Sequence, residues 1–142
     1  GHVRSPEAAT VLPALAAWPV EPPRVIAGFA PPSAPWGAGH RGIDLRAAAG
    51  VPVRAMAPGT VRFAGDVAGV PVVVVDHGSV RSTYEPVTAV VAVGDVVDRG
   101  AVIGFVADHG GHCAGRCLHL GVKDGDRYRN PLHWLGHAVL KP

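Results

Sequence analysis

The stretch His40-Arg41-Gly42-Ile43-Asp44 decides how the rest of this 142-residue sequence is interpreted. Its imidazole and carboxylate are both common zinc ligands, through nitrogen and oxygen. On a straight strand they would lie about 13 Å apart, at roughly 3.3 Å per residue. Two ligands of one zinc must come much closer, because each lies about 2 Å from the metal. Nearby Gly37, Gly39 and Gly42 argue against a helix. We therefore expect a loop that bends at Gly42 and leads into a strand, so that both side chains converge.

A third ligand is expected far along the chain, in Cys117-Leu118-His119-Leu120-Gly121-Val122. Alternation in a strand places residues 117 and 119 on one face, so both can look into one site. His40, Asp44 and His119 then give three protein ligands and leave a fourth position for water. That arrangement is typical of catalytic zinc, and we predict one zinc ion per chain.

Composition favours one all-β domain. Charged residues make up only 17% of the chain and the net charge is +2, with the basic residues scattered. This pattern gives no sign of nucleic-acid binding, and no apolar run reaches the 18 residues of a membrane span. Short apolar segments separated by turns recur at 24–29, 51–56, 60–64, 69–76, 80–85, 96–97, 101–106 and 117–123.

Helical periodicity is absent apart from one expected turn at 131–135. The run 69–76 is continuously apolar, which indicates a strand buried on both faces, and His77 after it is expected to cap a turn. We assign residues 1–20 to an N-terminal arm or linker, partly ordered from Trp18 onward, and residues 21–142 to the domain.

Four segments together resemble the LytM/lysostaphin-type zinc metalloendopeptidases, over about residues 24–136. They are Gly39–Asp44, Ala57–Val61, Val93–Gly104 and Leu118–Gly121, in the order and spacing of that family. The resemblance implies an antiparallel sandwich or hybrid barrel of the LytM (duplicated hybrid motif) type, with zinc held by His40, Asp44 and His119. It also implies cleavage of peptidoglycan peptide cross-links or stems by zinc-activated water, in a secreted or cell-envelope protein.

The sequence departs from this family at two places. The family uses two metal-free histidines, one two residues after a tyrosine and one opening a His-x-His motif. Here Pro86 and Cys117 stand at these positions. We name His112, in the glycine-rich loop before Cys117, and Glu85 as candidate catalytic replacements. The alternative is a catalytically degenerate module that binds cell-wall peptides or regulates a partner cell-wall hydrolase.

The two cysteines, Cys113 and Cys117, allow three interpretations. A structural zinc knuckle with His112 or His119 would normally need a second ligand pair at comparable spacing, which the sequence lacks. Free thiols are the second interpretation. The even count and the resemblance to wall-acting proteins favour the third, a disulfide that closes the loop.

Overall fold

The structure is a computed structural model and describes residues 16–30 and 40–135. Within these ranges there are eleven strands and one helical turn. The strands are β1 Val25–Ala27, β2 Ile43–Arg46, β3 Pro52–Arg54, β4 Gly59–Val67, β5 Val70–Asp76, β6 Arg81–Glu85, β7 Val87–Ala89, β8 Val96–Val97, β9 Val102–Val106, β10 Cys117–Asp124 and β11 Arg127–Arg129; the helix is α1 Leu132–Leu135.

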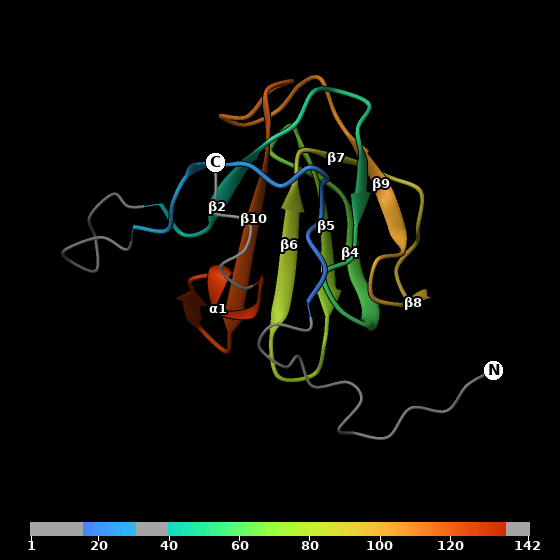
Figure 1. The fold of residues 1–142 in the computed structure, drawn as a ribbon. Coiled ribbons are helices and arrows are strands. Elements are labelled where there is room, and N and C mark those ends of the chain that lie inside the picture. Colours follow the sequence, from blue (N-terminus) through green and yellow to red (C-terminus); the bar gives the residue numbers. More distant parts are fainter. Residues whose placement is uncertain (1–15, 31–39, 136–142) are drawn as a thin grey trace.

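The strands form two antiparallel sheets (Figure 1). The large sheet runs in the order β1-β2-β10-β6-β5-β4-β8, with β11 paired to β10, and the small sheet runs in the order β3-β9-β7. The all-β, antiparallel prediction is confirmed, and the described strands form no closed barrel. Each predicted segment contains a strand, but β7, directly after Pro86, and β11 were not predicted.

Alternation along the central strands separates a core face from an outer face of the large sheet. On β10, Leu118 and Leu120 are fully buried in the core, so His119 between them points the other way. On β2, Ile43 and Leu45 enter the same core on either side of Asp44. Burying each such side chain contributes about 1.5–3 kcal/mol, so these leucines and isoleucine fix which face carries the polar residues.

The N-terminal residues that the structure describes lie against the domain. The backbone N–H of Ala17 donates to Met56 O (2.7 Å), and that of Arg54 donates to Pro19 O (2.8 Å). Val20 is buried in the core. The larger part of the predicted arm lies outside the described residues. Among the residues described, no helix is long and apolar enough to cross a membrane.

A buried polar network connects His77, which follows β5, with Ser82 and Tyr84 of β6. The backbone of His77 does close a turn, onto Val80 O, but its ring is buried. Its Nδ1–H donates to Pro58 O (2.7 Å), and its Nε2 shares a hydrogen bond with Ser82 Oγ (2.7 Å). Ser82 Oγ is bonded in turn to the hydroxyl of Tyr84 (2.7 Å). Every polar atom in the network is therefore paired, as a buried polar group requires.

Burial lowers the pKa of His77 below 6.5, although its bond to Pro58 and the charge of Asp76 act in the opposite direction. Below about pH 6.5, His77 is therefore protonated more readily in the unfolded chain than in the folded chain. The stability linked to His77 is fully present above about pH 6.5 and falls as the pH drops below that value. We expect metal-free protein to lose stability between pH 8 and pH 5 more steeply than its His77→Gln variant. Chemical unfolding at both pH values measures this, and equal pH dependence in the two proteins would contradict it.

Candidate metal centre

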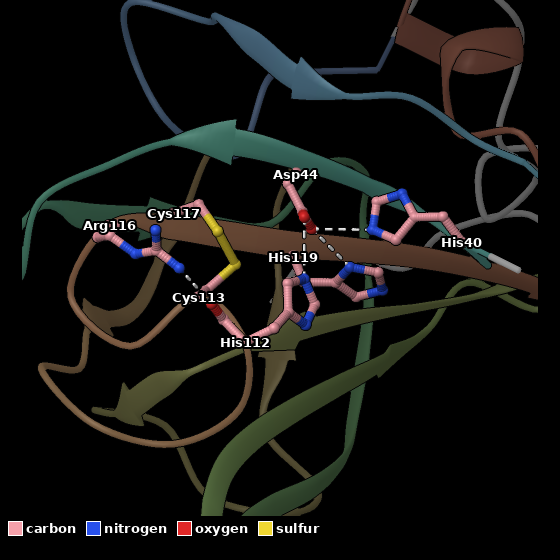
Figure 2. Close-up of a disulfide and its surroundings, with 7 residues drawn as sticks. All are labelled: His40, Asp44, His112, Cys113, Arg116, Cys117 and His119. Atoms are coloured by element: carbon pink, nitrogen blue, oxygen red, sulfur yellow. Dashed lines mark hydrogen bonds and ion pairs between the residues drawn. A yellow bond between two sulfur atoms is a disulfide. The ribbon is translucent and has the colours of Figure 1, made fainter. Parts of the chain in front are cut away.

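Four side chains converge on the outer face of the large sheet (Figure 2). Asp44 of β2 and His119 of β10 are direct cross-strand partners, so they share that face. His40 stands just before β2, where its backbone forms an isolated bridge with Ala30. His112 comes from the loop that precedes β10. The structure thus brings together the three predicted zinc ligands and one of the two predicted catalytic residues.

The carboxylate of Asp44 is the centre of this cluster. Its Oδ1 lies 2.8 Å from His119 Nδ1 and 3.1 Å from His40 Nε2, and its Oδ2 lies 2.9 Å from His112 Nε2. Burial alone would raise the pKa of Asp44. Hydrogen bonds and positive charge from His119 and His112 outweigh burial and bring the pKa from 3.8 down to about 2. Asp44 is therefore an anion at any physiological pH.

The orientation of His40 is fixed by a bond on the far side of its ring. Nδ1–H donates to the carbonyl of Gly28 at 2.7 Å, which leaves only a lone pair on Nε2 of the neutral ring. That lone pair faces Asp44 Oδ1, which also only accepts. Two acceptor atoms can lie this close together when a proton or a cation lies between them. A backbone bond that orients a histidine in this way is the usual support of a metal ligand.

The donor set fits zinc. The ligand atoms of His40, Asp44, His112 and His119 all lie within 4.8 Å of one another. Three imidazoles and one carboxylate are the nitrogen and oxygen donors that zinc accepts. Asp44 and His119 are largely buried, whereas the side chain of His112 is 55% exposed. His112 is therefore the member of the cluster most open to solvent and to a bound molecule.

Glu85, the other candidate catalytic residue, lies near the cluster without joining it. It is the cross-strand partner of His119 on β6, so it shares the outer face. Its carboxylate is not among the groups that lie within 4.8 Å of one another at the centre. The structure therefore supports His112 over Glu85 as the side chain next to Asp44.

A disulfide holds the loop that carries His112. Cys113 and Cys117 are bonded to each other, as the third interpretation of the cysteines predicted. Arg116 reinforces the loop: its Nη2 donates to the carbonyl of His112 (3.0 Å), and its backbone N–H donates to Cys113 O (2.7 Å). Cys117 begins β10, two residues before His119, so the bond ties His112 to the strand that carries His119 (Figure 2). Sequence reasoning missed Arg116, since an exposed arginine in a glycine-rich loop carries no distinctive signal.

Position 42 requires glycine because the chain passes close to β10 there, and not because of an unusual backbone angle. A Cβ there would run into the carbonyl oxygen of Leu120 and would lie 2.8 Å from His119 Nε2. Only glycine lets the segment between His40 and Asp44 pass this close to β10. The bare backbone at Gly42 thus leaves room for the ring of His119.

The candidate metal centre is separate from a hollow at the opposite edge of the large sheet, beside β4 and β8. That hollow measures about 600 Å³ and is lined mainly by apolar groups from β4, β8 and the turns beside them. None of the four clustered side chains lines it. The clustered side chains and this cavity are therefore separate features of the structure.

Comparison with known proteins identifies the family. The model of peptidase family M23 matches residues 38–131, a range that includes all four clustered side chains. The chain belongs to peptidase family M23. The resemblance to LytM/lysostaphin-type peptidases seen in the sequence is therefore confirmed.

One curated relative and two solved structures illustrate what the chain is similar to. An uncharacterized protein of Mycobacterium tuberculosis is 45% identical over 131 residues, covering 87% of this chain and 53% of that protein. The chain thus spans about half the length of the curated relatives it matches. The catalytic domain of lysostaphin from Staphylococcus simulans superposes with a TM-score of 0.66 at 24% identity, over 80% of this chain and 92% of that one. A chain in a complex of SpoIIIAH and SpoIIQ does so with a TM-score of 0.69 at 24% identity, over 82% of this chain and 97% of that one. At these identities the two structures show the fold alone.

Proposed function

We propose that this M23 chain is a zinc-dependent endopeptidase for peptidoglycan peptides, in which His112 replaces a catalytic histidine that the family places elsewhere. One observation carries the proposal: His112 Nε2 lies 2.9 Å from Asp44 Oδ2, inside the cluster formed with His40 and His119. The position that the resemblance assigns to the family's histidine holds Cys117, which is bonded to Cys113 and has no proton to exchange. The disulfide loop supplies an imidazole beside it.

His40, Asp44 and His119 would hold the zinc ion. When bound, zinc supplies Lewis acidity, which polarises a peptide carbonyl and makes water a better nucleophile near neutral pH. Each ligand has support from the chain itself. Gly28 orients His40, and the β2–β10 pairing sets Asp44 against His119. The ligand geometry therefore depends on the strands of the large sheet more than on flexible loops.

His112 is suited to accept and return a proton. It is the most exposed of the three clustered histidines, and its Nε2 lies at Asp44 inside the cluster. A base at this position can take the proton of the attacking water and pass it to the leaving amine. Glu85 remains the second candidate for this role, because it faces the same side of the sheet opposite His119.

The activity test is the release of new amino termini from peptidoglycan fragments with several kinds of cross-link. Zinc-loaded wild type is compared with His40→Ala, which lacks one ligand. We expect slow cleavage of at least one fragment by the wild type alone. If both proteins leave every substrate intact although the wild type holds zinc, the enzyme proposal is wrong.

Metal content gives a separate prediction. We expect about one zinc per chain in protein purified without chelators, and much less after His119→Ala, because His119 supplies a largely buried donor. Elemental analysis measures both. Full zinc content in His119→Ala would place the metal elsewhere, with the cysteines as the first alternative.

A binding or regulatory module is the second candidate function. It is favoured because Pro86 and Cys117 stand where the family has catalytic histidines. The neighbour in the complex with SpoIIIAH offers a precedent for a protein of this fold that assembles with a partner. In this alternative the same face binds wall peptides or a partner hydrolase without cutting. Peptide binding without cleavage by zinc-loaded protein would favour it.

The proposed location is outside the cytoplasm. A stable disulfide in a small domain is typical of oxidising compartments, and peptidoglycan lies there too. Fractionation of cells that express the full-length protein tests this. Recovery in the cytoplasm with both cysteines reduced would count against it.

A further inference from the structure

A group of cationic and aromatic side chains lies beside the metal centre on the same face of the large sheet. Lys123 stands four residues after His119 on β10, so both side chains point to the outer face. Lys123 pairs across the sheet with Arg81 of β6 and, on its other side, with Tyr128 of β11. With Arg41, which follows the zinc ligand His40, these residues are here called the cationic strip.

Tyr128 holds two of these charges together. Lys123 Nζ lies 5.2 Å from the centre of its ring, and the guanidinium carbon of Arg41 lies 5.7 Å from it. Both distances are typical of cation–π contacts. Across the described part of the chain, none of the three cations forms an ion pair with a carboxylate. The strip thus presents three cations that form no ion pair among the described residues, around an aromatic surface that is 40% exposed. Asp76 stands opposite Arg81 on β5 and is itself paired with Arg62.

Gly121 joins the cationic strip to the metal centre. A Cβ at this position would lie 3.9 Å from His119 Nε2 and 4.0 Å from a ring carbon of Tyr128, which are ordinary contacts. Gly121 is itself buried, and the Arg41 carbonyl oxygen lies 3.7 Å from the same Cβ position, so the missing side chain lets Arg41, His119 and Tyr128 lie close to one another over β10. His119 and Lys123 are about 13 Å apart along the strand, at roughly 3.3 Å per residue. An extended peptide of about four residues covers that distance.

We propose that the cationic strip binds a free carboxylate of a peptide whose backbone runs along the direction of β10 and reaches the metal centre. The inference rests on the proposed peptidase function and specifies its substrate class: peptides with a carboxylate within about four residues of the bond that is cut. Lys123, Arg41 and Arg81 supply charge-assisted hydrogen bonds, and the ring of Tyr128 supplies a surface for the peptide's apolar atoms.

The test compares two probes, acetylated tetra-alanine with a free terminal carboxylate and the same peptide ending in an amide. Binding to zinc-loaded protein is measured by calorimetry at low and high salt. We expect the acid to bind about tenfold more tightly at low salt, the size of effect of one charged contact, and the preference to shrink as salt screens it. In Lys123→Gln and in the Arg41→Gln/Lys123→Gln double variant, the preference should fall to about twofold or less.

Arg127→Gln is the matched control. Arg127 is exposed and adjacent to Tyr128, but alternation turns it to the opposite face, so the preference should remain. Zinc content is measured in every sample, because Arg41 neighbours a zinc ligand. A preference that persists in Lys123→Gln and the double variant would show that neither Lys123 nor Arg41 binds the carboxylate, and would overturn the proposal. Equal binding of the acid and the amide by wild type would also overturn it.

The outcomes separate this inference from the proposed function. A charge preference that the variants abolish, without release of amino termini from wall fragments, would support the cationic strip and refute the peptidase. Cleavage of wall fragments with no preference between the two probes would support the peptidase and refute the cationic strip.

Discussion

Replacing His112 with alanine is expected to lower the rate of peptidoglycan cleavage at least tenfold while the zinc content stays unchanged. A positioned acid or base contributes about 10²–10⁴-fold to a rate. His40, Asp44 and His119 are the proposed ligands, so His112 is the one clustered side chain that is not expected to hold the metal. The measurement is release of amino termini under single-substrate conditions, together with elemental analysis of the same samples.

His109→Ala is the matched control for this prediction. It removes an imidazole from the same loop, but His109 is exposed, its ring is bonded to Asp108 (2.9 Å), and it lies outside the cluster around Asp44. We expect its activity to stay within about twofold of wild type, as for surface substitutions with little effect. If His112→Ala retains full activity, another group accepts the proton, and Glu85→Gln becomes the variant to examine.

Opening the Cys113–Cys117 disulfide should lower activity in the same direction, because the bond holds His112 beside Asp44. A dithiol reductant transfers two electrons and two protons, so that both cysteines become thiols and the reductant becomes a disulfide. The freed sulfurs would lie within 4.8 Å of Asp44 and His112 donors, and thiolates bind zinc well. The cleaner experiment is therefore the Cys113→Ser/Cys117→Ser double variant, in which no thiolate competes for the metal.

The double serine variant separates positioning from redox chemistry. We expect it to resemble His112→Ala in rate, with zinc still bound to His40, Asp44 and His119, and to be insensitive to reductant. A double variant as active as wild type would show that the glycine-rich loop holds His112 without the bond.

The structure brings the three proposed zinc ligands together, because their positions follow from local rules. Alternation fixes the face of His119, and the buried residues on either side of Asp44 fix its direction. The position of His112 could not be derived in that way. Its loop has no periodic pattern, and its place depends on a disulfide and on Arg116. The sequence offered only its distance from Cys117 as a signal.

Two further features escaped prediction, for different physical reasons. The burial of His77 depends on partners from other strands and turns, namely Pro58 and Ser82, whereas the sequence shows only a histidine after an apolar run. The pairing of β11 with β10 brings Tyr128 beside Lys123, although Arg127–Arg129 carries no apolar alternation. The place of His77 depends on Pro58, 19 residues away in the chain, and single-sequence patterns report mainly local preference. In contrast, β11 joins β10 through the two-residue turn Gly125-Asp126, a local hairpin signal that our interpretation of the sequence did not use.

Gly42→Ala is expected to weaken zinc binding at least tenfold, although it adds one methyl group and removes no ligand. The added Cβ meets the Leu120 carbonyl, which belongs to the β10 backbone and has little freedom to move. Relief requires the segment that carries His40 and Asp44 to move away from β10, which separates these two side chains from His119. Overpacking of this kind typically costs about 1–3 kcal/mol, and a loss of about 1.4 kcal/mol corresponds to a tenfold change in affinity.

The control is Gly65→Ala, in β4 and remote from the centre. A Cβ at Gly65 meets only the ring of Phe63, at 3.5 Å, which is an ordinary contact. We therefore expect Gly65→Ala to change neither zinc affinity nor the unfolding midpoint appreciably, whereas Gly42→Ala should lower both. Competition with a chromophoric chelator measures the affinity. If Gly42→Ala binds zinc as tightly as wild type, the segment that carries His40 and Asp44 can shift without cost, and the ligand geometry does not depend on its close passage over β10.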